Sequence, residues 1–167
     1  MPIGSRFQYK TPEEIEIIRK NCLLVSATLA EVASHIKPGI TGLRLDEIAE
    51  AFIRDHGAEP AFKGYPGSLS DFPASLCISF NEVIVHGIPD KTEVKEGDVV
   101  SVDCGVKMNG YFGDAAFTFA VGQISPEVLD LLVTTRECLD LAIQQSVAGN
   151  RIGDIGYAVQ QHAEVNH

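Results

Sequence analysis

The dipeptide Asn109-Gly110 constrains the fold of this chain more than any other feature of its sequence. Both residues tolerate the positive backbone φ angle that a two-residue type I′ turn requires, and strand-like segments flank them at 99–106 and 111–121. The sequence therefore predicts a tight antiparallel hairpin, in which the turn pairs Met108 with Tyr111.

This register brings two aspartates to one face of the hairpin. It pairs Cys104 with Ala115 and Asp103 with Ala116, so that Asp103 and Asp114 become diagonal neighbours with Cα atoms about 7 to 8 Å apart. Unpaired carboxylates in a half-buried strand are costly, and one or two bound divalent metal ions would remove that cost. The alternative is ordinary, because aspartates near glycine are common in solvated turns.

Composition limits the classes of partner. The chain has 167 residues, enough for one domain with its own core, and 13 Lys plus Arg against 23 Asp plus Glu give a net charge of −10. This acidity opposes direct binding to nucleic acid or to an anionic membrane. The four cysteines form no C-x-x-C pair, and no segment has the length of an apolar membrane span. We therefore expect reduced thiols and a cytoplasmic location.

Helix signals surround the hairpin. Thr11-Pro12-Glu13-Glu14 is a helix start, and apolar residues at three- and four-residue steps predict a helix that ends before Lys37. Further predicted elements are a helix at 43–56, a loop at 58–74, one or two strands at 75–85, a helix at 126–147 and a last helix from about 152. This order predicts an α+β fold with a mainly antiparallel sheet.

A weak internal repeat divides the chain. Ser125-Pro126-Glu127 restates Thr11-Pro12-Glu13, and each tripeptide opens a long helix that is followed by a second one. The similarity is either chance recurrence of helix starts or a true repeat. A true repeat would place the first copy at about 11–124 and the start of the second at about 125–167.

Two other groups of residues have chemical potential. His86 lies where a strand gives way to a Gly and Pro turn, so it is either a proton donor and acceptor at the rim of a sheet or a plain turn histidine. Phe62, Tyr65 and Phe72 cluster in the loop before it, which suits either an apolar specificity pocket or ordinary core, and Cys77 would flank such a pocket. The sequence lacks a phosphate-binding loop, a zinc-binding H-E-x-x-H helix and a serine nucleophile elbow.

Three segments together resemble type I methionine aminopeptidases: 77–89, 96–103 and 110–114. The helix start at 11–15 and Lys37-Pro38-Gly39 also fit, so the resemblance spans nearly the whole chain. It implies the pita-bread (creatinase/aminopeptidase) fold, in which two pseudo-symmetric αβ halves enclose a dinuclear metal site. The chain would then be a single catalytic domain, 1–167, that contains the first half and the helices of the second.

The resemblance also assigns roles to individual residues. It implies that Asp103 and Asp114 are metal ligands and that His86 hydrogen-bonds the substrate near the scissile bond. It further implies a pocket for the methionine side chain, formed by Phe62, Tyr65, Phe72 and Cys77. The segment 66–71 departs from the family's pattern, because it makes the aromatic loop longer than usual.

The implied reaction is removal of the N-terminal methionine from nascent proteins whose second residue is small, by metal-hydroxide attack on the first peptide bond. It would use two divalent ions, Co, Mn, Fe or Zn. The family's other ligands, a histidine and two glutamates, belong to strands that would follow residue 167, so we expect the chain to be C-terminally incomplete and inactive alone. The alternative is a non-catalytic pita-bread module that binds proteins or peptides. The expected partners are nascent chains and ribosomal proteins, which the acidity of the chain allows. Nucleic acid and membranes are not expected partners. The intact protein is expected to be a monomer.

Overall fold

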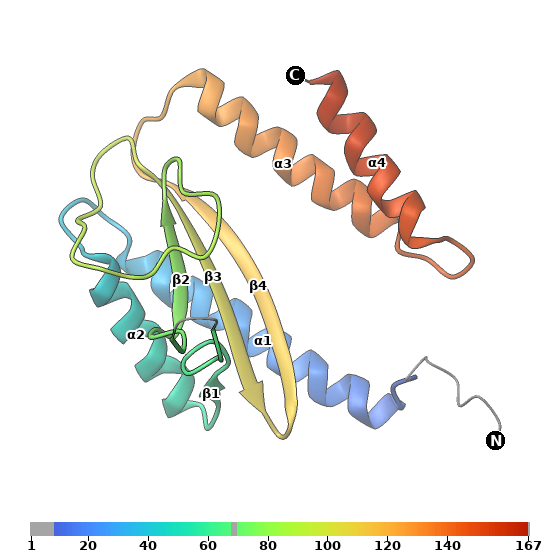
Figure 1. Ribbon diagram of the computed structural model, residues 1–167, viewed down its shortest axis with the longest axis horizontal. Coiled ribbons are helices and arrows are strands. Elements are labelled where there is room, and N and C mark those ends of the chain that lie inside the picture. Colours follow the sequence, from blue (N-terminus) through green and yellow to red (C-terminus); the bar gives the residue numbers. More distant parts are fainter. Residues whose placement is uncertain (1–8, 68–69, 167) are drawn as a thin grey trace. The chain divides into compact units, whose positions relative to one another are not determined.

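The structure, a computed structural model, describes residues 9–67 and 70–166 and contains four helices and four strands in that part of the chain (Figure 1). In chain order the elements are α1 (Pro12–His35), α2 (Gly42–Asp55), β1 (Glu59–Pro60), β2 (Leu76–Phe80), β3 (Val99–Met108), β4 (Tyr111–Ala120), α3 (Pro126–Gln145) and α4 (Ile152–Val165). They form two compact units, Met1–Gly122 and Gln123–His167.

The predicted start of the first helix is confirmed. The Thr11 hydroxyl accepts a hydrogen bond from the Glu14 amide at 3.2 Å, and the Glu14 carboxylate accepts one from the Thr11 amide at 2.7 Å. This reciprocal capping satisfies two amides that the first turn of a helix leaves without partners. The helix is further joined to the tip of the hairpin, since the Tyr111 hydroxyl donates to Glu14 Oε1 at 2.5 Å.

The sheet of the first unit is antiparallel throughout, as predicted. The central strand, β3, pairs with β4 along one edge and with β2 and the short β1 along the other. Asn109 and Gly110 have φ angles of 54° and 79°, as a type I′ turn requires, and Met108 pairs with Tyr111. The predicted hairpin and its register are therefore correct.

Side chains along β3 point alternately to a buried face of the sheet and to a face that is only partly buried. Val100, Val102, Cys104 and Val106 are fully buried and face α1 and α2, which lie along this side of the sheet in Figure 1. Gly113 of β4 allows α1 to lie close against the sheet, because a Cβ atom at this position would lie 2.6 Å from the backbone carbon of Asn21. The opposite face of the same strands carries Asp103 and Asp114.

Two predicted boundaries were wrong. The segment 75–85, where one or two strands were expected, contains β2, which ends at Phe80 because Asn81 adopts a positive φ of 50° that breaks the extended backbone. The segment 58–74 is not all loop, since Glu59 and Pro60 pair with Lys107 and Val106 as β1.

The second unit is a pair of helices. The Ser125 hydroxyl caps α3 by accepting from the Val128 amide, and His162 of α4 lies 2.7 Å from Glu137 of α3. The boundary between the units lies beside the division at 124 and 125 expected from the repeat, whereas the repeat itself stays a prediction. None of the described helices is long and apolar enough to cross a membrane.

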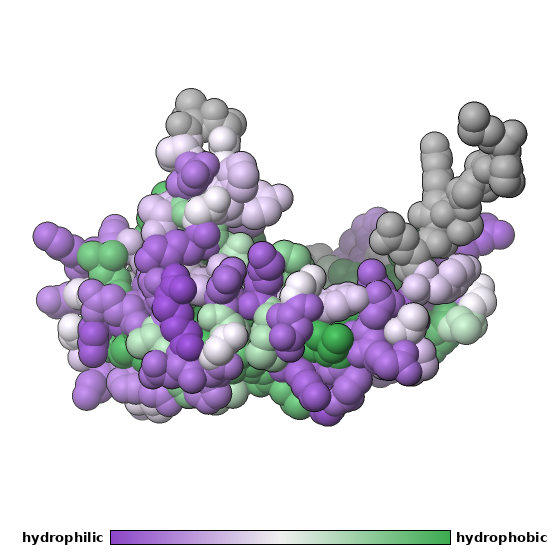
Figure 2. Space-filling model, turned by 90° about the horizontal axis from the view of Figure 1, so that it is seen from below, coloured by the Kyte–Doolittle hydropathy of each residue, from purple (hydrophilic) through white to green (hydrophobic). Residues whose placement is uncertain are grey.

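Polar residues cover most of the face seen in Figure 2, and apolar residues appear there in small separate patches. Scattered exposed apolar side chains are normal on a protein surface, so these patches by themselves indicate no binding site.

Candidate functional site

The hairpin places the two aspartates as the sequence predicted. Asp103 pairs with Ala116, and Gly105 pairs with Asp114, so the two carboxylates are diagonal neighbours on the face of the sheet that turns away from α1 and α2. Lys107, which shares this face by alternation, is directed to Glu59 of β1 at 3.9 Å.

Asp103 is the more enclosed of the two carboxylates. Its Oδ1 atom is buried and has no hydrogen-bond partner among the described residues, whereas Asp114 is exposed. Cys77 of β2 pairs directly with Asp103 in the sheet, which brings this buried thiol to the same face. A buried carboxylate oxygen without a donor is a position that a cation would stabilise.

The electrostatics of the site are dominated by burial and by the two negative charges. Burial, followed by the charge of Asp114, raises the pKa of Asp103, and the imidazole of His86 counteracts this effect. Burial and then the charges of Asp103 and Asp114 raise the pKa of Cys77 to about 11 and that of Cys104 to about 12. Both thiols are therefore neutral and unreactive at physiological pH.

His86 adopts a strained backbone conformation, and its imidazole lies near enough to Asp103 to affect the pKa of that carboxyl. Its φ of 59° lies in the left-handed region that non-glycine residues rarely adopt. The next residue, Gly87, is fixed on β2 at two points: its carbonyl accepts from the Ile78 amide at 2.8 Å, and its amide donates to Ser79 Oγ at 3.1 Å. A Cβ atom on Gly87 would lie 2.1 Å from the Ile78 oxygen, so only glycine fits. This role of Ser79 could not be predicted, because its partner Gly87 is eight residues away and outside the strand.

The aromatic loop lies partly over the same face. A Cβ atom on Gly105 would come within 2.6 Å of the Phe62 ring, so this ring packs against the strand position that pairs with Asp114. The Phe72 amide donates a hydrogen bond to the Tyr65 carbonyl at 2.9 Å, and the Phe72 carbonyl accepts one from the Gly64 amide at 2.8 Å. These bonds bring Tyr65 and Phe72 together across the extra residues 66–71.

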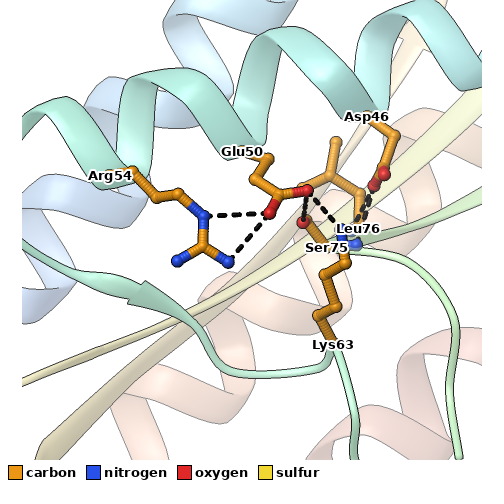
Figure 3. A network of polar contacts seen from close by, with 6 residues as sticks. All are labelled: Asp46, Glu50, Arg54, Lys63, Ser75 and Leu76. Carbon is orange, nitrogen blue, oxygen red and sulfur yellow. Dashed lines mark hydrogen bonds and ion pairs between the residues drawn. The ribbon is translucent and has the colours of Figure 1, made fainter.

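A network of charged residues, which sequence reasoning missed, joins this loop to α2 (Figure 3). Asp46, on the helix predicted at 43–56, is buried, and its Oδ1 atom accepts from the amides of Ser75 and Leu76 at 2.9 and 2.8 Å. Glu50 binds Lys63 at 2.6 Å and Arg54 at 2.8 Å. Helical spacing alone could not distinguish these residues from a solvated face, because their partners are distant in sequence.

The described residues contain no group of three or more His, Cys, Asp and Glu side chains arranged to hold a metal ion. Asp103 and Asp114 nevertheless fit a divalent cation in their chemistry, since carboxylate oxygens are ligands of such ions and one of these oxygens is buried without a donor.

The chain is similar to bacterial methionine aminopeptidases along most of its length. It is 46% identical over 155 residues to methionine aminopeptidase 1 of Bacillus subtilis and 46% identical over 156 residues to the methionine aminopeptidase of Clostridium acetobutylicum. In both comparisons the match covers 93% of this chain and 61% of the relative, so the chain spans about three fifths of these proteins.

Solved structures agree with the predicted pita-bread fold. The methionine aminopeptidase of Thermotoga maritima has a TM-score of 0.89 at 38% identity, over 95% of this chain and 62% of that one. The prolidase of Pyrococcus furiosus has a TM-score of 0.82 at 22% identity, over 93% and 44%, which indicates a shared fold alone. Residues 16–167 match a protein family whose description is metallopeptidase family M24. Since that match covers most of the sequence, the chain belongs to metallopeptidase family M24.

Proposed function

We propose that the protein to which this chain belongs removes the N-terminal methionine from nascent proteins with a small second residue. The observation that carries this proposal is the pair Asp103 and Asp114 on one face of the hairpin, with a buried Asp103 oxygen that lacks a donor among the described residues. The similarity to methionine aminopeptidases at 46% identity supports the choice of substrate.

In this proposal Asp103 and Asp114 would hold two divalent ions from among Co, Mn, Fe and Zn. Bound divalent ions supply Lewis-acid chemistry, which activates water and polarises a peptide carbonyl. The burial of the Asp103 Oδ1 atom strengthens its attraction for a cation, because charges interact more strongly where water is excluded. Asp114 is exposed, so a peptide in solvent can reach this carboxylate.

The remaining residues would orient the peptide. His86 is exposed and lies close enough to Asp103 to lower its pKa, so its imidazole can hydrogen-bond a substrate beside the two carboxylates. Phe62, Tyr65, Phe72 and Cys77 would receive the methionine side chain, whose flexible thioether packs well against aromatic rings. The strained backbone at His86 supports a functional role, because such strain concentrates at active sites.

Two carboxylates are fewer ligands than a tightly bound divalent ion takes from a protein. We therefore propose that the 167-residue chain alone does not turn over peptides. We also propose a cytoplasmic location, a monomeric state and, at most, contact with ribosomal proteins rather than with RNA, the last because of the net charge of −10.

The test uses the protein as its natural reading frame encodes it, with Met-Gly-Met as the substrate and Mn²⁺ or Co²⁺ as the metal. We expect release of methionine that a chelator abolishes and that Asp103→Asn and Asp114→Asn each reduce at least about 100-fold, because each removes a charged ligand. Asp140→Asn is the matched control, since Asp140 is an exposed carboxylate in α3 that pairs with Arg136. Peptide binding without metal-dependent hydrolysis would instead support the alternative, a peptide-binding module.

A further inference from the structure

The loop between β1 and β2 carries three of the four proposed pocket residues but contains little regular structure. Within it, the two hydrogen bonds among Gly64, Tyr65 and Phe72 join its arms. At its start, the Ala61 amide donates to the Gly105 carbonyl of β3 at 2.9 Å. Of these backbone hydrogen bonds, only the one from Ala61 joins the loop to the sheet. The position of the rest of the loop over the sheet therefore depends on side-chain contacts.

One carboxylate of α2 contacts both ends of this loop. Glu50 Oε2 binds Lys63 Nζ at 2.6 Å, directly after Phe62, and accepts from the Ser75 hydroxyl at 3.1 Å, directly before β2 (Figure 3). The aromatic residues Phe62, Tyr65 and Phe72 therefore lie on a loop whose ends meet at a single oxygen atom.

The other oxygen of Glu50 belongs to a separate interaction. Arg54 donates from Nε at 2.9 Å and approaches with Nη2 at 2.8 Å, both toward Oε1. Arg54 lies one turn after Glu50 on α2, and no hydrogen bond or ion pair joins it to the described residues of the loop. Arg54 thus offers a variant that removes an ion pair of Glu50 and leaves the two loop contacts in place.

The Glu50 side chain is 23% exposed, so its contacts are less screened by water than those of a fully exposed pair. Lys63 and Ser75, together with the neighbouring bonds from Asp46 to the Ser75 and Leu76 amides, fix the loop ends to a helix that contributes no residue to the proposed site.

We propose that Glu50 is a positioning residue for the substrate, because it holds both ends of the aromatic loop against α2 and thereby fixes the pocket for the first side chain of the peptide. This inference rests on the proposed function. The aspartates proposed to hold the metal lie on β3 and β4, whereas Glu50 lies on α2. Loosening the loop therefore weakens substrate binding and leaves the chemical step intact.

The kinetic test compares Glu50→Gln, Lys63→Met and Arg54→Met in the protein as its reading frame encodes it. With Met-Gly-Met and Mn²⁺, we expect Glu50→Gln and Lys63→Met each to raise KM about 10-fold, the effect of losing one charge-assisted contact, with kcat within about twofold of the wild type. The double variant should match the worse single variant, because both changes remove the same contact. Arg54→Met should leave KM within about twofold. A fall in kcat at unchanged KM, no change in KM, or an equal rise of KM in Arg54→Met would overturn the inference.

Hydrogen exchange over residues 61–75 supplies a readout that does not need activity. Exchange in this loop should accelerate in Glu50→Gln and Lys63→Met and stay at the wild-type rate in Arg54→Met. If the wild-type protein fails to release methionine, the proposed function fails, and this exchange pattern alone decides whether Glu50 holds the loop. If the wild-type protein is active and the loop exchanges equally in all variants, the inference fails and the proposed function stands.

Discussion

At the scale of single residues, Asp103 combines a cost to the fold with a proposed role in binding a metal ion. Its buried Oδ1 atom has no donor in the part of the chain that the structure describes, and an unpartnered buried charge is destabilising. We therefore expect Asp103→Asn to lower the affinity for Mn²⁺ at least about 100-fold while the metal-free protein keeps its stability or gains about 1 kcal/mol. Titration calorimetry with Mn²⁺ and urea unfolding in a chelator measure the two effects. A stability loss of several kcal/mol in the metal-free variant would show that the carboxylate has a structural partner.

The backbone at His86 leads to a second prediction at this scale. Gly87→Ala would force a Cβ atom to within 2.1 Å of the Ile78 carbonyl oxygen, so the His86 loop must move off β2. We expect kcat for Met-Gly-Met to fall at least about 10-fold, because His86 loses its place beside Asp103. Ser79→Ala removes the acceptor of the Gly87 amide and should have a smaller effect in the same direction. Gly156→Ala, in α4, is a control glycine variant, because its Cβ atom would meet no atom within 4 Å; a loss of kcat there as large as in Gly87→Ala would contradict this explanation.

At the scale of elements, Asp46 joins α2 to the start of β2. Asp46→Ala leaves the amides of Ser75 and Leu76 without an acceptor in a buried place, and we expect it to lower the free energy of unfolding by about 2 to 4 kcal/mol. Asp46→Asn keeps an acceptor oxygen and should cost less than about 1 kcal/mol at pH 7. Urea unfolding measures both variants.

The difference in stability between Asp46→Asn and the wild type should depend on pH, because burial raises the pKa of Asp46. A raised carboxyl pKa means that the folded state favours the protonated form, so the stabilising contribution is complete below the unfolded pKa and is lost as the pH rises through the folded pKa. The stability of Asp46→Asn relative to the wild type should therefore increase from about pH 4 to pH 7. If the stability of Asp46→Asn relative to the wild type falls over this range, the pKa of Asp46 in the folded state is lowered rather than raised.

The contact of α1 with β4 gives another prediction for the elements. Gly113→Ala places a methyl group 2.6 Å from the backbone of Asn21, and backbone on both sides cannot give way as a flexible side chain can. We expect a loss of about 1 to 3 kcal/mol of unfolding free energy, the usual cost of overpacking, in thermal or urea unfolding. Gly153→Ala in α4 meets no atom within 4 Å and should be neutral or stabilising.

At the scale of the whole molecule, the two units differ in how much apolar surface they bury. The core cluster of the described residues, from Leu24 to Val121, lies entirely in the first unit, and no described residue of α3 or α4 is buried. We expect a fragment of residues 1–122 to unfold cooperatively in urea. A fragment of residues 123–167 should lose most of its helical circular dichroism in water, because a helix pair without a buried face has little to stabilise it. Stable, cooperative folding of the second fragment would contradict this view.

Much of the fold could be predicted from the sequence, because its strongest signals are local. Asn109-Gly110 sets the turn and hence the register, and the caps at Thr11 and Ser125 set the helix starts. Asp103 and Asp114 share a face as a direct consequence of that register. The end of β2 at Phe80 and the short β1 were missed, because a positive φ at Asn81 and a two-residue pairing leave no periodic pattern.

The sequence by itself therefore determined the hairpin, its register, the helix starts and the shared face of the two aspartates. Only the tertiary structure decided that Asp46 is buried, that Glu50 contacts both ends of the aromatic loop and that Ser79 fixes the residue after His86. The reason is physical: turns, caps and strand alternation act between residues close in the chain, whereas the partner of a buried carboxylate is chosen by packing between distant segments.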